Sequence, residues 1–291
     1  MSGVASDNWV TRASSPLSAT PRPFLRWAGS KQKLLPDLVP LIPTEFGTYF
    51  EPFLGAGSMF FLLKPTLAVL SDACQPLIAT YESVRDNPSA VLKLLATMDV
   101  LDKNYYYEIR ASQPQGRHRQ AARFVYLNRS CWNGLYRVNK NGEFNVPYGA
   151  PKTSSPMDEV NLRACSDALR QSGIVLKSGD FEDVLRDAKQ GDFVFLDPPY
   201  VTGHNNNGFI DYNERLFSWE DQKRLAAVAR RLVDEGVFVL ATNAAHDDVV
   251  RLYRGFGARP ITRSSTLASA VTSRRAVKEV ALWAPIREHT R

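Results

Sequence analysis

The fold of this chain is decided by residues 48–57, which read TYFEPFLGAG. Residues 48–51 have the aromatic and β-branched composition of a short strand, and the rest of the stretch is a turn rich in proline and glycine. The apolar run 59–63 predicts the start of a helix. Residues 67–70 predict a second strand that ends near Asp72. A strand, a turn, a helix and a strand in this order indicate an open α/β sheet.

Further strands and helices are predicted downstream. Apolar runs predict strands at 174–176, 193–197, 237–241, 259–262 and 276–283. Helices are predicted at 181–188 and 218–235. Ser218, with Asp221 three residues later, has the spacing of a capped helix start. We therefore predict an α/β, Rossmann-like sheet of about seven strands.

An insertion interrupts the α/β pattern. Residues 76–130 have apolar side chains at helical spacing, and residues 135–146 predict a β-hairpin. Asn141-Gly142 favours a two-residue type I′ turn, because both central positions of that turn have positive φ. The predicted organisation is a disordered tail at 1–22, a catalytic domain at 23–73 and 171–291, and an inserted, mainly helical domain at 74–170 that carries the hairpin.

The net charge is +6 and the pI is about 9.2. The excess of positive charge is concentrated in one part of the chain. Residues 110–140 hold seven basic side chains and neither aspartate nor glutamate. They are Arg110, Arg117, Arg119, Arg123, Arg129, Arg137 and Lys140. A local field of one sign attracts a polyanion. A solvated basic surface explains the same pattern, and composition alone favours neither interpretation.

Composition also excludes several classes of protein. The chain has no run of about 18 apolar residues, so we expect no membrane span. The three cysteines, Cys74, Cys131 and Cys165, are scattered and odd in number, which argues against a disulfide framework and fits a cytoplasmic protein. The four histidines lie far apart in the sequence, and no metal site is expected.

The residues Asp197-Pro198-Pro199-Tyr200 follow a predicted strand and form the candidate catalytic site. Ligands of open α/β sheets bind at the carboxyl ends of strands. The set suits an exocyclic amino group, whose lone pair is conjugated into its ring. The Asp197 carboxylate and the Pro198 carbonyl can accept the two amino hydrogens, the prolines hold the backbone, and Tyr200 can stack on a flipped base. The alternative is a strand that ends in a proline turn.

The glycine-rich turn is a candidate nucleoside site. Gly55 and Gly57 allow a ligand to approach the backbone closely, and Asp72, 17 residues after Gly55, can bind ribose hydroxyls. Phe60 stands where the dinucleotide pattern has its last glycine, which disfavours a nicotinamide cofactor. Glu51 belongs to the same motif and is a candidate cofactor ligand. A tight turn with a surface acid is the alternative.

Taken together, these motifs resemble those of the Dam-type adenine-specific DNA methyltransferases, over residues 24–283. Residues 26–31, RWAGSK, are similar to the family's N-terminal cofactor motif, usually KWAGGK. Residues 50–60 resemble its glycine-rich motif, residues 128–149 contain a stretch similar to its recognition hairpin, and Asp197–Tyr200 matches its catalytic motif in full. Arg26, Ser30 and Cys74 depart from the usual family residues at their positions.

The resemblance implies a site-specific methyltransferase that transfers a methyl group from S-adenosyl-L-methionine to the 6-amino group of adenine in double-stranded DNA, by base flipping and direct in-line transfer. The implied cofactor-binding residues are Trp27, Lys31, Glu51, Gly55, Gly57, Asp72, Asp180 and Asp197, with Asp180 accepting from the cofactor's adenine. The insertion would then be a DNA-recognition domain, with Arg129, Asn133 and Arg137 as candidate phosphate or base contacts.

Several alternatives stay open at this point. The same class of enzyme acts on the amino group of cytosine or on adenine in RNA, and a catalytically inactive DNA-binding homologue would keep the same fold. Methylation at carbon-5 of cytosine is disfavoured, because in that family a proline precedes the nucleophilic cysteine and here none does. No obligate protein partner is inferred, and a monomer is the default. A cognate restriction endonuclease is a further partner compatible with the resemblance.

Overall fold

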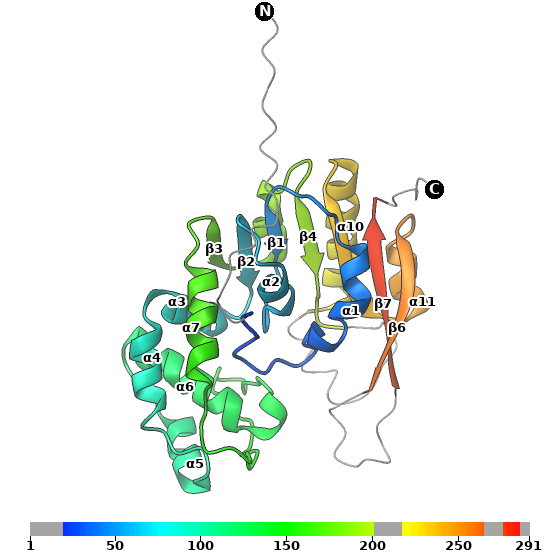
Figure 1. Cartoon of the computed structure of the whole chain (residues 1–291). Coiled ribbons are helices and arrows are strands. Elements are labelled where there is room, and N and C mark those ends of the chain that lie inside the picture. The colour runs from blue at the N-terminus through cyan, green and yellow to red at the C-terminus, as the bar shows by residue number, and fades with distance from the viewer. Residues whose placement is uncertain (1–19, 201–216, 265–275, 286–291) are drawn as a thin grey trace, which may run out of the picture.

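A seven-stranded sheet forms the centre of the computed structural model, which describes residues 20–200, 217–264 and 276–285. The strand order is β3-β2-β1-β4-β5-β7-β6 (Figure 1). The strands are β1 (Tyr49–Glu51), β2 (Ala68–Asp72), β3 (Ile174–Ser178), β4 (Phe193–Leu196), β5 (Phe238–Ala244), β6 (Gly257–Ser264) and β7 (Ala276–Ala284). The seven predicted strands are all present, displaced by a few residues at their ends, and the Rossmann-like α/β prediction is confirmed.

The order of the strands creates a switch point between β1 and β4. β1 pairs in parallel with β2 on one side and with β4 on the other. β7 lies between β5 and β6 and is antiparallel to both. In sheets of this kind the chain leaves the two central strands in opposite directions, which opens a crevice at their carboxyl ends. The predicted catalytic motif follows β4 and the glycine-rich turn follows β1, so both lie at this point.

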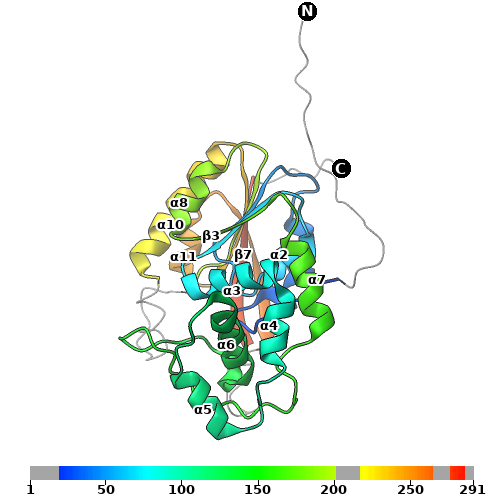
Figure 2. The same ribbon diagram turned by 90° about the vertical axis from the view of Figure 1, so that its left-hand side faces the viewer.

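Both faces of the sheet are covered by helices, which explains why the strands are apolar at nearly every position. Tyr49 and Phe195 pack into the core on one face, whereas Phe50 and Val194 pack into the core on the other. Figure 2 shows the sheet between α8 and α10 on one side and α2 and α7 on the other. The helices on the first side are α8 (Phe181–Val184), α10 (Trp219–Asp234) and α11 (Asp247–Leu252).

The remaining helices lie on the opposite face or, like α4, α5 and α6, pack on the helices there and extend beyond the end of the sheet (Figure 1). They are α1 (Leu35–Leu38), α2 (Ser58–Leu63), α3 (Gln75–Asp86), α4 (Pro88–Leu95), α5 (Lys103–Ala111), α6 (Arg117–Ser130) and α7 (Glu159–Leu169). Short 3-10 turns are found at Lys31–Lys33, Val39–Leu41, Trp132–Gly134 and Leu185–Asp187. The predicted mainly helical character of 76–130 is therefore correct. Val91 and Tyr106 of this part belong to the same apolar core as Leu70 of β2, so the helices and the sheet are packed together.

The predicted hairpin is present, but its predicted turn type is wrong. The strands meet through a single bridge between Val138 and Phe144. Gly142 has φ of 78°, whereas Asn141 is not among the described residues with positive φ. The Gly142 N–H donates to the Asn139 carbonyl (3.0 Å), and the Asn139 N–H donates to the Glu143 carbonyl (2.8 Å). This is a three-residue loop, a type I turn followed by a left-handed glycine, rather than a type I′ turn.

The Asn139 side chain provides the physical reason for the difference. Its Oδ1 accepts hydrogen bonds from the backbone N–H groups of Asn141 (2.9 Å) and Glu143 (3.0 Å). Asparagine side chains commonly stabilise such turns by binding the backbone two residues on. The asparagine that organises the turn is therefore the one at its start, and only Gly142 needs the left-handed conformation.

The start of α10 agrees with the sequence pattern. The Ser218 hydroxyl accepts from the Asp221 N–H (3.1 Å), and the Asp221 carboxylate accepts from the Ser218 N–H (2.9 Å), so the capping box is complete. Of the predicted disordered tail, residues 1–19 lie outside the described residues, and the Arg22 N–H donates to Asn161 of α7 (2.8 Å). None of the helices in the described ranges combines the length and the hydrophobicity of a membrane span.

Candidate active site at the carboxyl edge of the sheet

The glycine-rich turn after β1 is held by Asp72 at the end of β2. The Asp72 carboxylate accepts from the Gly55 N–H (3.0 Å) through one oxygen and from the Cys74 N–H (2.9 Å) through the other. Gly55 has φ of 47°, and a Cβ atom built there would lie 2.6 Å from Cδ1 of Trp27. The turn therefore needs glycine for both its conformation and the close approach of Trp27. The structure brings these three predicted cofactor residues together.

Trp27 also connects the turn to the hairpin. Its indole stacks on Tyr136 with a centroid distance of 5.6 Å and an interplanar angle of 19°. Its centroid lies 6.4 Å from that of Phe124 in α6. In addition, the Asn128 side chain accepts from the Arg26 N–H (2.8 Å) and donates to the Arg26 carbonyl (2.6 Å). The segment that carries Trp27 is thus fixed to the insertion on both its backbone and its aromatic ring.

The predicted catalytic carboxylate, Asp197, lies in a buried network that the sequence did not predict. Asp197 Oδ1 accepts from Lys31 Nζ (2.5 Å) and from the Thr242 hydroxyl (2.8 Å). Lys31, whose side chain is only 3% exposed, also donates to the Gly29 carbonyl (2.7 Å). Lys31 was predicted as a cofactor residue. The structure places its ammonium group on the Asp197 carboxylate, with Thr242 of β5 as a second donor.

Tyr200 is held by two partners that come from opposite ends of the chain. Its hydroxyl donates to Glu279 Oε2 of β7 (2.6 Å), and Lys31 Nζ lies 4.8 Å from the centroid of its ring. Glu279 is fully buried, and its Oε2 is 3.8 Å from Lys31 Nζ. Sequence reasoning missed Glu279. A single acidic residue within the otherwise apolar end of the last strand was the sign that could have identified it.

Burial dominates the electrostatics of this site. Burial raises the pKa of Asp197, an effect that the charge and hydrogen bond of Lys31 and the hydroxyl of Thr242 oppose. Burial also raises the pKa of Glu51 to about 8, against the hydrogen bond that the Tyr49 hydroxyl donates to its carboxylate (2.8 Å). Glu51 is thus largely protonated at neutral pH, whereas Lys31 favours the ionised form of Asp197.

Asp180 lies at the same edge but has a partner of its own. The Gly179 N–H donates to the Asp72 carbonyl (3.3 Å), which places the segment after β3 beside the end of β2. The Asp180 carboxylate is bound in a bidentate manner by Arg224 of α10, at 2.7 and 3.1 Å. It also caps α8 by accepting from the Glu182 N–H (2.9 Å). Arg224, which sequence reasoning did not single out, orients this predicted cofactor residue.

The three predicted DNA contacts lie in different environments. Arg137 is exposed on the hairpin, and its Nε donates to Asn145 Oδ1 (2.7 Å). Asn133 is exposed and has φ of 55°. Arg129 is half-buried, and burial lowers its pKa, as does the charge of the neighbouring Arg26. Arg137 and Asn133 therefore face outward, whereas Arg129 is partly inside the insertion.

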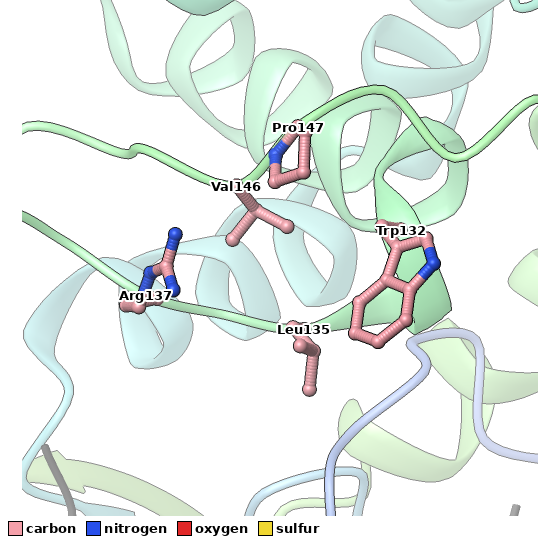
Figure 3. Close-up of a pocket in the computed structure, with 5 residues that line it drawn as sticks. All are labelled: Trp132, Leu135, Arg137, Val146 and Pro147. Atoms are coloured by element: carbon pink, nitrogen blue, oxygen red, sulfur yellow. The ribbon is translucent and has the colours of Figure 1, made fainter. Parts of the chain in front are cut away.

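A pocket of about 280 Å³ lies at the base of the hairpin. Figure 3 shows the five side chains that line it, Trp132, Leu135, Arg137, Val146 and Pro147. Trp132 is 38% exposed, which is unusual for a tryptophan within a packed domain. The pocket combines apolar walls with one guanidinium group, and the side chains come from two segments that only the hairpin brings together.

The basic stretch at 110–140 divides into structural and exposed members. Arg123 donates to the carbonyls of Ile109 (2.9 Å) and Arg110 (2.5 Å) and so satisfies the end of α5. Arg117 forms an ion pair with Asp86. The side chains of Arg119, Arg137 and Lys140 are exposed. The charge density seen in the sequence therefore overstates the positive surface, because part of it supports the fold.

One antiparallel strand, β7, lies between β5 and the edge strand β6 of an otherwise parallel sheet, and an acid-proline-proline-tyrosine motif lies at the switch point. Together these features define an α/β methyltransferase. The chain belongs to the family of D12 class N6 adenine-specific DNA methyltransferases, whose model matches residues 27–267. The protein is therefore an adenine-specific DNA methyltransferase, as the motifs predicted, and its substrate is DNA. Methyltransferases of this kind generally use S-adenosylmethionine.

Relatives of nearly the same length support this assignment. The chain is 37% identical over 266 residues to the type II methyltransferase M1.LlaDCHI of Lactococcus lactis subsp. cremoris, covering 89% of this chain and 94% of the relative. It is 32% identical over 263 residues to the type II methyltransferase M.MjaIII of Methanocaldococcus jannaschii, covering 82% and 90%. It is 32% identical over 234 residues to the DNA adenine methylase of Escherichia coli K12, covering 79% and 82%.

Proposed function

We propose that this enzyme flips its target adenine out of the duplex and methylates the 6-amino group directly at Asp197-Pro198-Pro199-Tyr200. The observation that carries the proposal is the arrangement of hydrogen bonds at Asp197. Both of its side-chain contacts within the described part of the chain are made to Oδ1. Oδ2 is then the oxygen that accepts an amino hydrogen of the base, and the Pro198 carbonyl accepts the other.

Two accepted hydrogen bonds draw the amino nitrogen toward tetrahedral geometry and make its lone pair available for the methyl group. The reaction is then a matter of placing the nitrogen in line with the departing sulfur. Lys31 assists because its ammonium group, against the effect of burial, favours the ionised form of Asp197, in which both carboxylate oxygens are acceptors. The ring of Tyr200, three residues after Asp197, is the stacking surface for the extruded base.

The methyl donor is S-adenosyl-L-methionine, which supplies an electrophilic methyl group when bound. The residues proposed to hold it are Trp27, Lys31, Glu51, Gly55, Gly57, Asp72, Asp180 and Asp197. Gly55 has no side chain and lies against the Trp27 indole, so the turn offers a nucleoside bare backbone beside an aromatic ring. The carboxylate of Asp72 fits ribose hydroxyls, and Asp180, oriented by Arg224, fits the amino group of the cofactor's adenine.

The division of the chain follows from this assignment. We assign residues 23–73 and 171–291 to the catalytic domain and residues 74–170 to an inserted DNA-recognition domain. Arg137 and Asn133 on the exposed hairpin are the proposed base or phosphate contacts, together with Arg129. The pocket beside Arg137 gives this surface both apolar and cationic character, which suits contacts with the edges of bases.

Transfer of labelled methyl from S-adenosyl-L-methionine to unmethylated duplex DNA, with nucleoside analysis of the digest, tests the proposal. We expect the label in N6-methyladenine, and sequencing of the modified DNA identifies the site. Asp197→Ala should lower kcat by about a thousandfold or more while the protein stays folded, with a lower melting temperature because the buried Lys31 ammonium loses its partner. Asp183→Ala, which removes an exposed carboxylate near the same edge, is the matched control. Substantial turnover by Asp197→Ala would refute the mechanism.

A further inference from the structure

Glu279 is a carboxylate in a place where carboxylates are rarely found. It lies in β7, opposite Ala244 of β5 and Ile261 of β6, and its side chain is fully buried. Its neighbour Val280 packs in the apolar core on the face that is covered by α8, α10 and α11. Burial of a carboxylate is costly unless hydrogen bonds and opposite charge compensate it. At Glu279 the compensating groups include two side chains of the proposed active site, Tyr200 and Lys31.

We propose that Glu279 is a positioning residue that fixes the ring of Tyr200 for stacking against the target adenine. The proposal rests on the stacking role proposed for Tyr200. The Tyr200 hydroxyl donates to Glu279 Oε2 at 2.6 Å, the short distance expected of a charge-assisted hydrogen bond. The two prolines before Tyr200 have fixed φ angles and so restrict the backbone that leads to it, and the hydrogen bond restrains the far end of its side chain. The ring is then fixed at both ends before any base arrives.

Lys31 completes the arrangement on the face of the ring. Its Nζ lies 4.8 Å from the Tyr200 centroid and 2.5 Å from Asp197 Oδ1. The base therefore stacks on the ring face away from Lys31, while its amino group meets Asp197. Glu279 contributes by keeping that face in a constant orientation. The energetic reason is preorganisation, since a ring already in place loses no rotational freedom when the base is extruded.

Glu279 can influence the reaction in a second way, which must be separated from its hydrogen bond with Tyr200. We call the effect through that hydrogen bond the Tyr200 route and the effect through the charge of Lys31 the Lys31 route. Glu279 Oε2 is 3.8 Å from Lys31 Nζ, so its charge also acts on the ammonium group that holds Asp197. The two routes differ in what they need from residue 279. The Tyr200 route needs an acceptor oxygen, which glutamine retains, whereas the Lys31 route needs a negative charge, which glutamine lacks.

The experiment compares Glu279→Leu, Glu279→Gln, Tyr200→Phe and the double variants with Tyr200→Phe. The measurements are kcat and KM on an unmethylated duplex that carries the target site, and the fluorescence of 2-aminopurine at the target position of a second duplex. Leucine at 279 should lower kcat and the fluorescence rise by about tenfold or more, with the KM for S-adenosyl-L-methionine unchanged. Glutamine should restore most of both. In the Tyr200→Phe background, substitution at 279 should have little further effect.

Val280→Ala is the matched control, because it removes buried volume from the same strand without touching Tyr200. It should lower the melting temperature and leave kcat unchanged. Independent, multiplicative effects of residues 279 and 200, or a glutamine variant as impaired as the leucine variant, would overturn the proposal. If Glu279→Leu does not fold, Tyr200→Phe decides alone, and wild-type kcat and fluorescence in that variant would equally overturn it. Failure of the wild type to extrude the base would instead contradict the proposed function.

Discussion

The carboxyl edge of the sheet and the hairpin of the insertion hold their polar side chains in different ways. At the sheet edge, Asp197 is bound by Lys31 and Thr242, which come from distant parts of the chain, and Lys31 is buried. On the hairpin, exposed Arg137 bonds to Asn145, only eight residues away. The first arrangement is preorganised by tertiary packing, and the second is local and open to solvent. A preorganised site suits a reaction in which one atom must be positioned accurately. A locally held, exposed surface suits contacts that must adapt to a duplex.

Removal of Lys31 should have the largest effect, because it removes the central cation of the buried network at the sheet edge. Lys31→Met leaves Asp197 and Glu279 close together in a buried site without their common counter-charge. We expect kcat to fall by about a hundredfold, and the free energy of unfolding to fall by about 3 kcal/mol. Methyl transfer assays and urea denaturation measure the two effects. Lys33→Met, an exposed position in the same short turn, serves as the control. A Lys31→Met enzyme with normal kcat would show that the buried ion pair has no role in the reaction.

Substitution of Gly55 tests the turn that joins the two regions. In Gly55→Ala the new Cβ lies against Trp27 and the backbone keeps a left-handed conformation. We expect about tenfold weaker binding of S-adenosyl-L-methionine by calorimetry, because the turn or the indole must move. Gly116→Ala, also at positive φ but with open space around the position, controls for backbone strain alone. Equal cofactor affinity of Gly55→Ala and the wild type would argue against a close approach of the cofactor here.

A substitution on the hairpin should change DNA binding without changing cofactor binding. Arg137→Ala should weaken DNA binding by about tenfold and lower the salt dependence of binding, with the affinity for S-adenosyl-L-methionine unchanged. Fluorescence anisotropy with a labelled duplex at several salt concentrations measures this. Arg186→Ala, an exposed arginine outside the insertion, is the matched control. If Arg137→Ala binds DNA and selects its target as the wild type does, Arg137 makes no contact with the duplex.

Glu51 gives the smallest effect, a pH dependence of stability. Its folded pKa of about 8 lies above the ordinary value of 4.5. The folded state thus holds this proton more tightly, and the stabilisation is lost as the pH rises through the window between the two values. Between about pH 7 and pH 9 we expect the wild type to lose about 1 kcal/mol more than Glu51→Gln. Thermal unfolding of both proteins across this range measures it, and parallel curves would place the titration elsewhere.

Local sequence was sufficient to predict the elements and the motifs they carry. Seven strands, the long α10 helix with its Ser218–Asp221 capping box, and the catalytic motif after β4 all depend on neighbours within a few residues. The sequence signals are the short apolar runs of the strands, the helical spacing of apolar side chains in α10, the glycines that permit positive φ and the prolines that end a strand. The class of reaction followed from these motifs, and the family assignment agrees with it.

The partners of the catalytic groups were decided only by the tertiary structure. Lys31 precedes Asp197 by more than half the chain, and Glu279 follows it in the last strand. They meet because β7 inserts in antiparallel orientation beside β5, in a register that sets Glu279 opposite Ala244, two residues beyond Thr242. Sequence patterns report the face and the period of an element, but a hydrogen bond between distant side chains depends on strand order and register. The same reason explains why the bidentate contact of Arg224 with Asp180 had no counterpart in the sequence.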